Sequence, residues 1–151
     1  LLLIVANGAP MVLSTLLGNR GYPVDCGLVL GDGRYLFGPS KSWRGLAISL
    51  ATTGLIAWLM GLGASFGGGF AAFAMLGDLT SSFIKRRLGL DSGDRARGLD
   101  QLPEGLLPAL PAWWMLDASW WVVLLAAFVF SVLNIWGSPL LYRLGVRRRP
   151  H

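Results

Sequence analysis

Four polar residues share one face of a predicted helix whose other residues are mostly apolar. Their spacing of i, i+3, i+4 and i+7 places them on a single helical face, and they are Asp78, Ser81, Ser82 and Lys85. The interval from Asp78 to Lys85 corresponds to about 10 Å of helix. An ionisable side chain inside an apolar segment is costly to bury unpaired, so it indicates a functional role. The alternative is a structural salt bridge between Asp78 and a basic side chain.

The segment that follows this helix, residues 85–101, alternates acidic and basic residues with glycines and a serine. Its charged members are Lys85, Arg86, Arg87, Asp91, Asp94, Arg95, Arg97 and Asp100. Carboxylates without histidine or thiolate favour a hard cation such as Mg²⁺, which shares its ligands with substrate phosphates. Lysine and arginine bind the same phosphates. The alternative, a basic anchor at a membrane surface, explains the bases but not the aspartates.

A third polar element, residues 32–45, ends with Lys41 and Arg44 at the start of an apolar segment. Glycine and proline predict turns within it. Its composition is similar to that of phosphate-binding loops, but the GxxxxGK[ST] pattern is absent. By itself this element is only weak evidence for phosphate binding.

Composition excludes several classes of protein. The chain has 151 residues, of which 54% are hydrophobic and only 14% charged, far from the roughly 25% charged residues of a soluble domain. Cys26 is the only cysteine and His151 the only histidine, which excludes an internal disulfide framework and any mechanism that needs paired histidines. The net charge of +5 is compatible with nucleic acid, anionic lipid or a phosphorylated substrate.

Charge-free stretches divide the chain into candidate membrane spans. A hydrocarbon core of about 30 Å needs about 20 helical residues, and the glycine-rich segment 61–69 predicts a tight hairpin between two spans. We therefore predict one all-α, polytopic domain over residues 1–151. Its five transmembrane helices are expected at about 1–19, 45–61, 67–86, 103–117 and 119–142, with segment 103–117 short and interrupted by Pro108 and Pro111.

The distribution of basic residues predicts the orientation of these helices. With the N-terminus outside and the C-terminus in the cytoplasm, all 13 lysines and arginines fall on the cytoplasmic side, in loops 20–44 and 87–102, at their margins and in the C-terminal tail. This location favours lipid headgroups and phosphates over nucleic acid. In the tail, the bases Arg147, Arg148 and Arg149 serve as an anchor alone. At the outer face, an interfacial aromatic belt is expected from Trp113, Trp114, Trp120 and Trp121.

The polar segments together resemble a known family. The sequences GD at 77–78 and KR at 85–86, with Asp91-Ser92-Gly93 and Asp100, resemble the signature region of the phosphatidate cytidylyltransferases. The closer resemblance, over essentially the whole chain, is to the CDP-archaeol synthases. It rests on DGR at 32–34, LFG at 36–38, KSWRG at 41–45, SFIKRR at 82–87 and DQL at 100–102.

The resemblance implies transfer of CMP from CTP to 2,3-bis-O-(geranylgeranyl)-sn-glycerol 1-phosphate, with Mg²⁺, at the cytoplasmic face of the cell membrane. It implies metal ligands at Asp78, Asp91 and Asp100, and catalytic roles for Asp78, Lys85, Arg86 and Asp100. The implied phosphate ligands are Lys41, Arg44, Lys85, Arg86 and Arg87. Arg95 and Arg97 are weaker candidates for phosphate binding, and Asp25 and Asp32 are weaker candidate members of the site. One departure is Pro103-Glu104, where the family has a second aspartate. Either Glu104 substitutes from a shifted position or that carboxylate is dispensable.

Two other functions compete with this interpretation. A CDP-alcohol phosphotransferase needs D-x₂-D-G-x₂-A-R and a second aspartate pair, and Asp25 and Asp32 do not have that spacing. A small protein that binds or transports anionic phospholipids would use the same bases but would tolerate few acids. The aspartates at 78, 91 and 100 therefore count against a simple binding protein.

Overall fold

The computed structural model describes residues 1–18, 21–92, 94, 96, 99–115, 117 and 119–143. The helices in this part of the chain are α1 (Leu2–Leu17), α2 (Trp43–Leu59), α3 (Ala64–Arg87), α4 (Gln101–Leu106), α5 (Ala109–Met115) and α6 (Trp120–Arg143). No β-strand forms among these residues beyond two isolated bridges, so the predicted all-α class is confirmed. By length and apolarity, no helix within the described ranges qualifies as a membrane-crossing segment.

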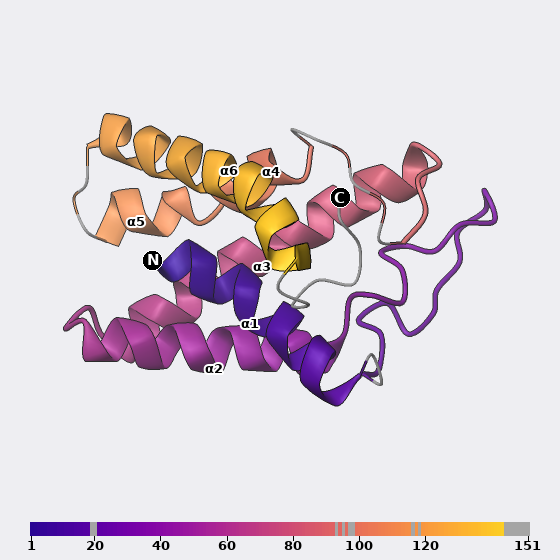
Figure 1. Ribbon diagram of the computed structural model, residues 1–151, viewed down its shortest axis with the longest axis horizontal. Coiled ribbons are helices and arrows are strands. Elements are labelled where there is room, and N and C mark those ends of the chain that lie inside the picture. Colours follow the sequence, from indigo (N-terminus) through magenta and orange to yellow (C-terminus); the bar gives the residue numbers. More distant parts are fainter. Residues whose placement is uncertain are drawn as a thin grey trace.

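Helix α3 lies at the centre of the molecule and contacts α1, α2, α4 and α5. Figure 1 shows α1 and α2 on one side of it and the α4, α5 and α6 group on the other. The polar segment between α1 and α2 projects from the end of the molecule at which α3 terminates (Figure 1). The ends of α2 and α3 that carry the polar residues are therefore brought to one end of the helical group.

A proline in α1 creates a contact with α2. Pro10 has no N–H, so the carbonyl oxygen of Ala6, four residues earlier, lacks its helical donor. The buried hydroxyl of Ser49 in α2 donates to that oxygen at 2.8 Å. The proline position in α1 is thereby matched to a single polar residue of α2, which fixes the register between the two helices.

Helices α2 and α3 are joined by the tight turn at residues 60–63, and they pack closely because α3 carries glycine at the contact. A Cβ atom on Gly67 would lie 2.6 Å from the carbonyl oxygen of Thr53 and would overlap Ala57. The hairpin was predicted within the glycine-rich segment 61–69, between helices at about 45–61 and 67–86, and Gly67, Gly68 and Gly69 lie within α3 as that second range predicts. At Gly67 the glycine serves helix packing rather than a turn.

Segment 103–117, predicted as one helix, is two short helices. The break falls at Leu107 and Pro108 between α4 and α5. Because Pro108 has no N–H to donate to the carbonyl of Glu104, the helical hydrogen-bond ladder is interrupted there. The remaining predicted segments correspond to α1, α2, α3 and α6 with shifts of a few residues.

The C-terminal end of α3 is capped by a Schellman motif. The N–H of Leu90 donates to the carbonyl of Lys85 at 3.0 Å, and that of Gly89 donates to the carbonyl of Arg86 at 3.2 Å. Gly89 has φ +84°, a conformation that favours glycine. The chain therefore turns sharply after α3 and returns along the site described next.

Candidate active site

The first predicted site residues to meet are Lys41 and Asp78. The Nζ atom of Lys41 lies 2.5 Å from Oδ1 and 2.6 Å from Oδ2 of Asp78. Both side chains keep about a fifth of their surface exposed, 21% and 22%. Burial alone lowers the pKa of Lys41, but the carboxylate of Asp78 outweighs it and raises the pKa. Lys41 therefore stays cationic beside the C-terminal half of α3.

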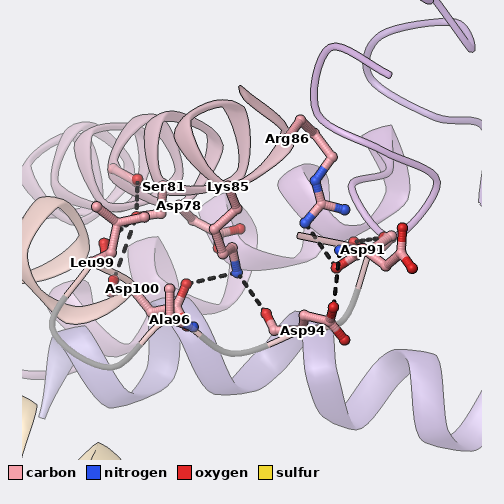
Figure 2. A network of polar contacts seen from close by, with 12 residues as sticks. Asp78, Ser81, Lys85, Arg86, Asp91, Asp94, Ala96, Leu99 and Asp100 are labelled. Carbon is pink, nitrogen blue, oxygen red and sulfur yellow. Dashed lines mark hydrogen bonds and ion pairs between the residues drawn. The ribbon is translucent and has the colours of Figure 1, made fainter. Parts of the chain in front are cut away.

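A second ion pair joins Asp100 to Lys85, which lies about two helical turns beyond Asp78 on the same face of α3. Their Nζ and Oδ1 atoms lie 2.6 Å apart. The other oxygen of Asp100 accepts the backbone N–H of Ala96 at 3.0 Å, while Lys85 also donates to the carbonyl of Asp94 at 3.2 Å. Figure 2 shows Lys85 reaching from α3 to both of these acceptors. The returning segment is thus held against α3 through one lysine.

Ser81 fixes where this returning segment enters α4. Its hydroxyl lies 3.0 Å from the carbonyl oxygen of Gly77 and 3.1 Å from that of Leu99 (Figure 2). Because Leu99 immediately precedes Asp100, the contact sets the position of the Asp100 backbone relative to α3. The predicted polar stripe of α3 therefore includes a residue that aligns the site as well as residues that carry charge.

Glu104 brings a further carboxyl group to Asp78. Its side chain is buried and interacts electrostatically with the carboxyl group of Asp78. The approach of α4 depends on Gly77, since a Cβ atom there would overlap the carbonyl oxygen of Pro103 and lie 2.9 Å from the Cα of Glu104. Glu104 was noticed in the sequence only as a departure from a family pattern, and its distance from Asp78 could not be read from spacing.

Asp91 is separated from the other predicted metal ligands. Figure 2 shows it beside Arg86, on the opposite side of Lys85 from Asp100. The guanidinium of Arg86 is buried and donates to the carbonyl of Asp91 at 2.9 Å. The side chain of Asp91 is exposed. Arg86 and Asp91 therefore border the site rather than converge on Asp78.

The other predicted phosphate ligands have different surroundings. Arg44 donates to the carbonyl of Gly18 at 2.5 Å, at the end of α1. Arg87 forms an ion pair with Asp32, with 2.7 Å between Nη1 and Oδ2. Arg95 and Arg97 lie outside the described residues. The described bases closest to Asp78 and Asp100 are thus Lys41 and Lys85.

Asp25 organises the first polar loop. Its Oδ2 atom accepts the N–H groups of Phe37 and Gly38, both at 2.9 Å, and its Oδ1 atom accepts that of Gly27 at 3.0 Å. Burial raises the pKa of Asp25, but these hydrogen bonds outweigh it and lower the pKa below the ordinary value of 3.8. This structural role was not predicted, because the donors are backbone groups that carry no sequence signature.

The carboxyl groups can be compared with the needs of a divalent cation. Within the described residues, no three His, Cys, Asp or Glu side chains converge closely enough to hold a metal ion by themselves. Mg²⁺ in nucleotide sites uses one or two carboxylates and completes its coordination with phosphate oxygens and water. Two carboxyl groups close enough to interact electrostatically, as Asp78 and Glu104 are, also favour a cation beside them. The donors present therefore fit Mg²⁺ shared with a phosphate substrate.

The site combines carboxylates with lysines that pair with them, and no histidine is among its described residues. This combination is typical of sites that bind phosphate-bearing substrates. The comparisons identify the family. A profile of the CarS-like family, described as CDP-archaeol synthase, matches residues 2–151. The chain therefore belongs to the CarS-like CDP-archaeol synthase family, as the sequence motifs predicted.

Individual relatives agree with this assignment. The CDP-archaeol synthase of Hyperthermus butylicus is 44% identical over 117 residues, covering 72% of this chain and 67% of that protein. That of Pyrobaculum aerophilum is 36% identical over 152 residues, covering 97% and 91%. A solved structure of an intramembrane enzyme for archaeal membrane lipid biosynthesis is 32% identical, with a TM-score of 0.70 over 90% of each chain.

Proposed function

We propose that this chain is a CTP-dependent cytidylyltransferase that converts 2,3-bis-O-(geranylgeranyl)-sn-glycerol 1-phosphate to its CDP-activated form. Membership of the CDP-archaeol synthase family supports this activity. The observation that carries the assignment of the site is the grouping of Lys41, Asp78, Lys85, Asp100 and Glu104 where α3 meets the first loop and α4. Two ammonium groups and three carboxyl groups therefore lie together, a donor set that can bind both phosphate oxygens and a divalent cation.

In the reaction, an oxygen of the lipid phosphate attacks the α-phosphorus of CTP. The bond between that phosphorus and the oxygen bridging to the β-phosphate breaks, and pyrophosphate leaves. A phosphate monoester has a second pKa of about 6 and is mostly dianionic at neutral pH. The nucleophile therefore needs no protein base, which is consistent with a site built from lysines and carboxylates without histidine.

Charge repulsion is the main barrier that the site must overcome. The incoming lipid phosphate and the triphosphate are both anionic, so cationic groups must stabilise the charge that develops on pyrophosphate. Mg²⁺ held by Asp78 and Asp100, with Glu104 beside Asp78, would neutralise phosphate charge. Lys41 pairs with Asp78, and Lys85 pairs with Asp100. From these positions both ammonium groups can donate hydrogen bonds to phosphate oxygens.

Arg86 and Asp91 are proposed to act at the border of the site. Arg86 holds the backbone of Asp91 and so positions the start of the returning segment. Asp91 then supports the metal site as a ligand or as a partner of groups around it. Arg44, through its contact with α1, orients the loop that carries Lys41.

The protein is proposed to be a multi-pass membrane protein whose N-terminus is outside and whose active site faces the cytoplasm. The related intramembrane enzyme supports the membrane location. Large apolar side chains also remain exposed along α6, including Leu125 and Phe128 at 61% and 66%, as expected for contact with lipid. A site at the inner end of α3 lets CTP enter from the cytosol while the isoprenoid chains stay in hydrocarbon.

Two labelled forms of CTP test the proposed reaction. The purified protein is incubated in detergent with Mg²⁺, the ether-lipid phosphate and CTP labelled at either the α- or the γ-phosphate. The proposal predicts that α-label enters the lipid and γ-label appears as pyrophosphate. Replacing the ether lipid by a diacylglycerol phosphate measures lipid selectivity. Absence of any labelled lipid would instead support a binding or transport protein.

A further inference from the structure

The first polar loop contains a hairpin that docks on the C-terminal end of α3. The hairpin is closed by the bridge between Val29 and Tyr35 and by a hydrogen bond from the N–H of Leu30 to the carbonyl of Arg34 at 2.9 Å. Its contacts with α3 involve Asp32, Arg34 and Arg87, which we call the hairpin latch. Each of the two arginines reaches across to the element that carries the other.

Arg34 reaches from the hairpin to α3. It donates from Nη1 to the carbonyl oxygen of Arg86 at 3.1 Å, in the last helical turn, where carbonyl groups lack intrahelical donors and favour cations. Gly89 leaves the space that this guanidinium fills, since a Cβ atom there would lie 2.5 Å from Nη1 of Arg34. A glycine already required by the helix cap thus also forms the docking surface for Arg34.

Arg87 reaches from α3 to the hairpin. It pairs with Asp32 at 2.7 Å and donates from Nη2 to the carbonyl of Tyr35 at 2.7 Å. The Phe83 ring lies beneath its guanidinium, 5.4 Å from centroid to Cζ. The other carboxylate oxygen of Asp32 accepts the N–H of Arg34 at 3.2 Å. The polar contacts of Arg87 are therefore directed at the hairpin, away from Asp78.

The backbone beyond the hairpin connects the latch to Lys41. Asp25 holds the N–H groups of Phe37 and Gly38 just after the hairpin. The N–H of Lys41 donates to the carbonyl of Gly38 at 3.2 Å, and its carbonyl accepts the N–H of Val24 at 2.9 Å. The main chain at Lys41 is thus fixed on both sides by a loop whose far end is docked on α3.

We propose that the hairpin latch positions Lys41 for its contact with Asp78, so that Arg34 and Arg87 are positioning residues rather than phosphate ligands. The reaction assigned to Lys41 rests on the proposed function, but the positioning itself does not. Helix α3 carries both Asp78 and Arg87. Docking of the hairpin on Arg87 at the end of this helix therefore sets the distance between Lys41 and Asp78. Loss of the latch releases the loop from α3.

Charge exchange separates positioning from phosphate binding. Arg87→Asp and Asp32→Arg each place like charges opposite one another, and we expect kcat for CMP transfer to fall about 10- to 100-fold because small misplacements of a reacting group have effects of that size. The double variant Asp32→Arg/Arg87→Asp restores an ion pair and is expected to recover at least about tenfold over Arg87→Asp. A phosphate ligand at Arg87 would leave the double variant as inactive as the single one, which would overturn the proposal.

A second measurement requires no CTP. In a Cys26→Ser background, Lys41→Cys is alkylated with a soluble maleimide, with and without Arg87→Gln or Arg34→Gln. We expect the thiol at position 41 to react about five times faster when either arginine is replaced. The control Arg148→Gln, in the C-terminal tail, should leave the rate equal to that of Cys26→Ser/Lys41→Cys alone. Equal rates in all variants would show that the latch does not hold Lys41. The proposed function is tested separately, by CMP transfer with the wild-type protein. If the wild type transfers no CMP, the proposed function is refuted, but the alkylation rates of the Lys41→Cys variants still decide whether the latch holds residue 41.

Discussion

Lys41 and Asp78, separated by 37 residues in sequence, form an ion pair with the ammonium nitrogen 2.5 Å from one carboxylate oxygen. The pair exists because α2 and α3 are joined by a tight turn and run side by side, which brings the residues just before α2 close to the C-terminal half of α3. The first loop and α3 therefore both contribute residues to one site, and α4 contributes Glu104.

Gly77→Ala is expected to damage the site through packing. A methyl group at this position would overlap the backbone of Pro103, and overpacking of this kind costs about 1–3 kcal/mol. Displacing α4 also moves Glu104 from Asp78, so turnover should fall along with the melting temperature. Gly68→Ala on the same helix is the matched control, because nothing lies within 4 Å of its added Cβ. Unchanged stability and activity in Gly77→Ala would contradict the close approach of α4.

The contact between α1 and α2 predicts a coupling between Ser49 and Pro10. Ser49→Ala leaves the buried carbonyl of Ala6 without a donor, which should cost about 1–3 kcal/mol of unfolding free energy. In a Pro10→Ala background, the N–H of residue 10 can supply the helical hydrogen bond, so Ser49→Ala should cost less. Thermal or denaturant unfolding of the four proteins measures the difference. Identical costs in both backgrounds would rule out the compensation.

Asp25 predicts a dependence of stability on pH. Its pKa is lowered in the folded protein from the ordinary value of 3.8, so its contribution is present above about pH 4 and is lost as the pH falls through the lower, folded-state value. Asp25→Asn should therefore melt at a lower temperature than the wild type at neutral pH, and the difference should shrink toward pH 3. A difference that stays constant across this range would contradict the role of the carboxylate charge.

Part of the site could be predicted from local spacing. The helical repeat placed Asp78, Ser81 and Lys85 on one face of a helix, and α3 has them there. The segment of aspartates and bases that returns to this face was recognised from its composition and from motifs. Lys41 was predicted by resemblance to bind phosphate, but its contact with Asp78 depends on the packing of α2 against α3 and could not be predicted from spacing.

Other features depend on contacts that have no sequence signature. Arg87 was expected to bind phosphate, yet it forms an ion pair with Asp32 in the hairpin that docks on the end of α3. Asp25 binds backbone N–H groups, which every sequence provides. The break between α4 and α5 was indicated by Pro108, but the distribution of basic residues favoured one membrane-spanning segment over 103–117.

The orientation of the helices can be tested by labelling. In a Cys26→Ser background, Ala64→Cys places a thiol at the start of α3, which the basic residues predict to face the outside. A membrane-impermeant maleimide should label it in intact cells, whereas Leu88→Cys, exposed at the other end of α3, should be labelled only after permeabilisation. Labelling of position 64 from the cytoplasmic side alone would reverse the proposed orientation.

The central claim is that Asp78 belongs to the reacting centre, and replacing its charge tests this most directly. Transfer of α-labelled CMP to the ether-lipid phosphate is measured in detergent for the wild type, Asp78→Asn and the exposed control Asp117→Asn, whose left-handed backbone (φ +51°) asparagine tolerates. We predict that Asp78→Asn remains folded and monodisperse but has no detectable transfer, while Asp117→Asn retains wild-type activity. Retained transfer by folded Asp78→Asn would contradict the account.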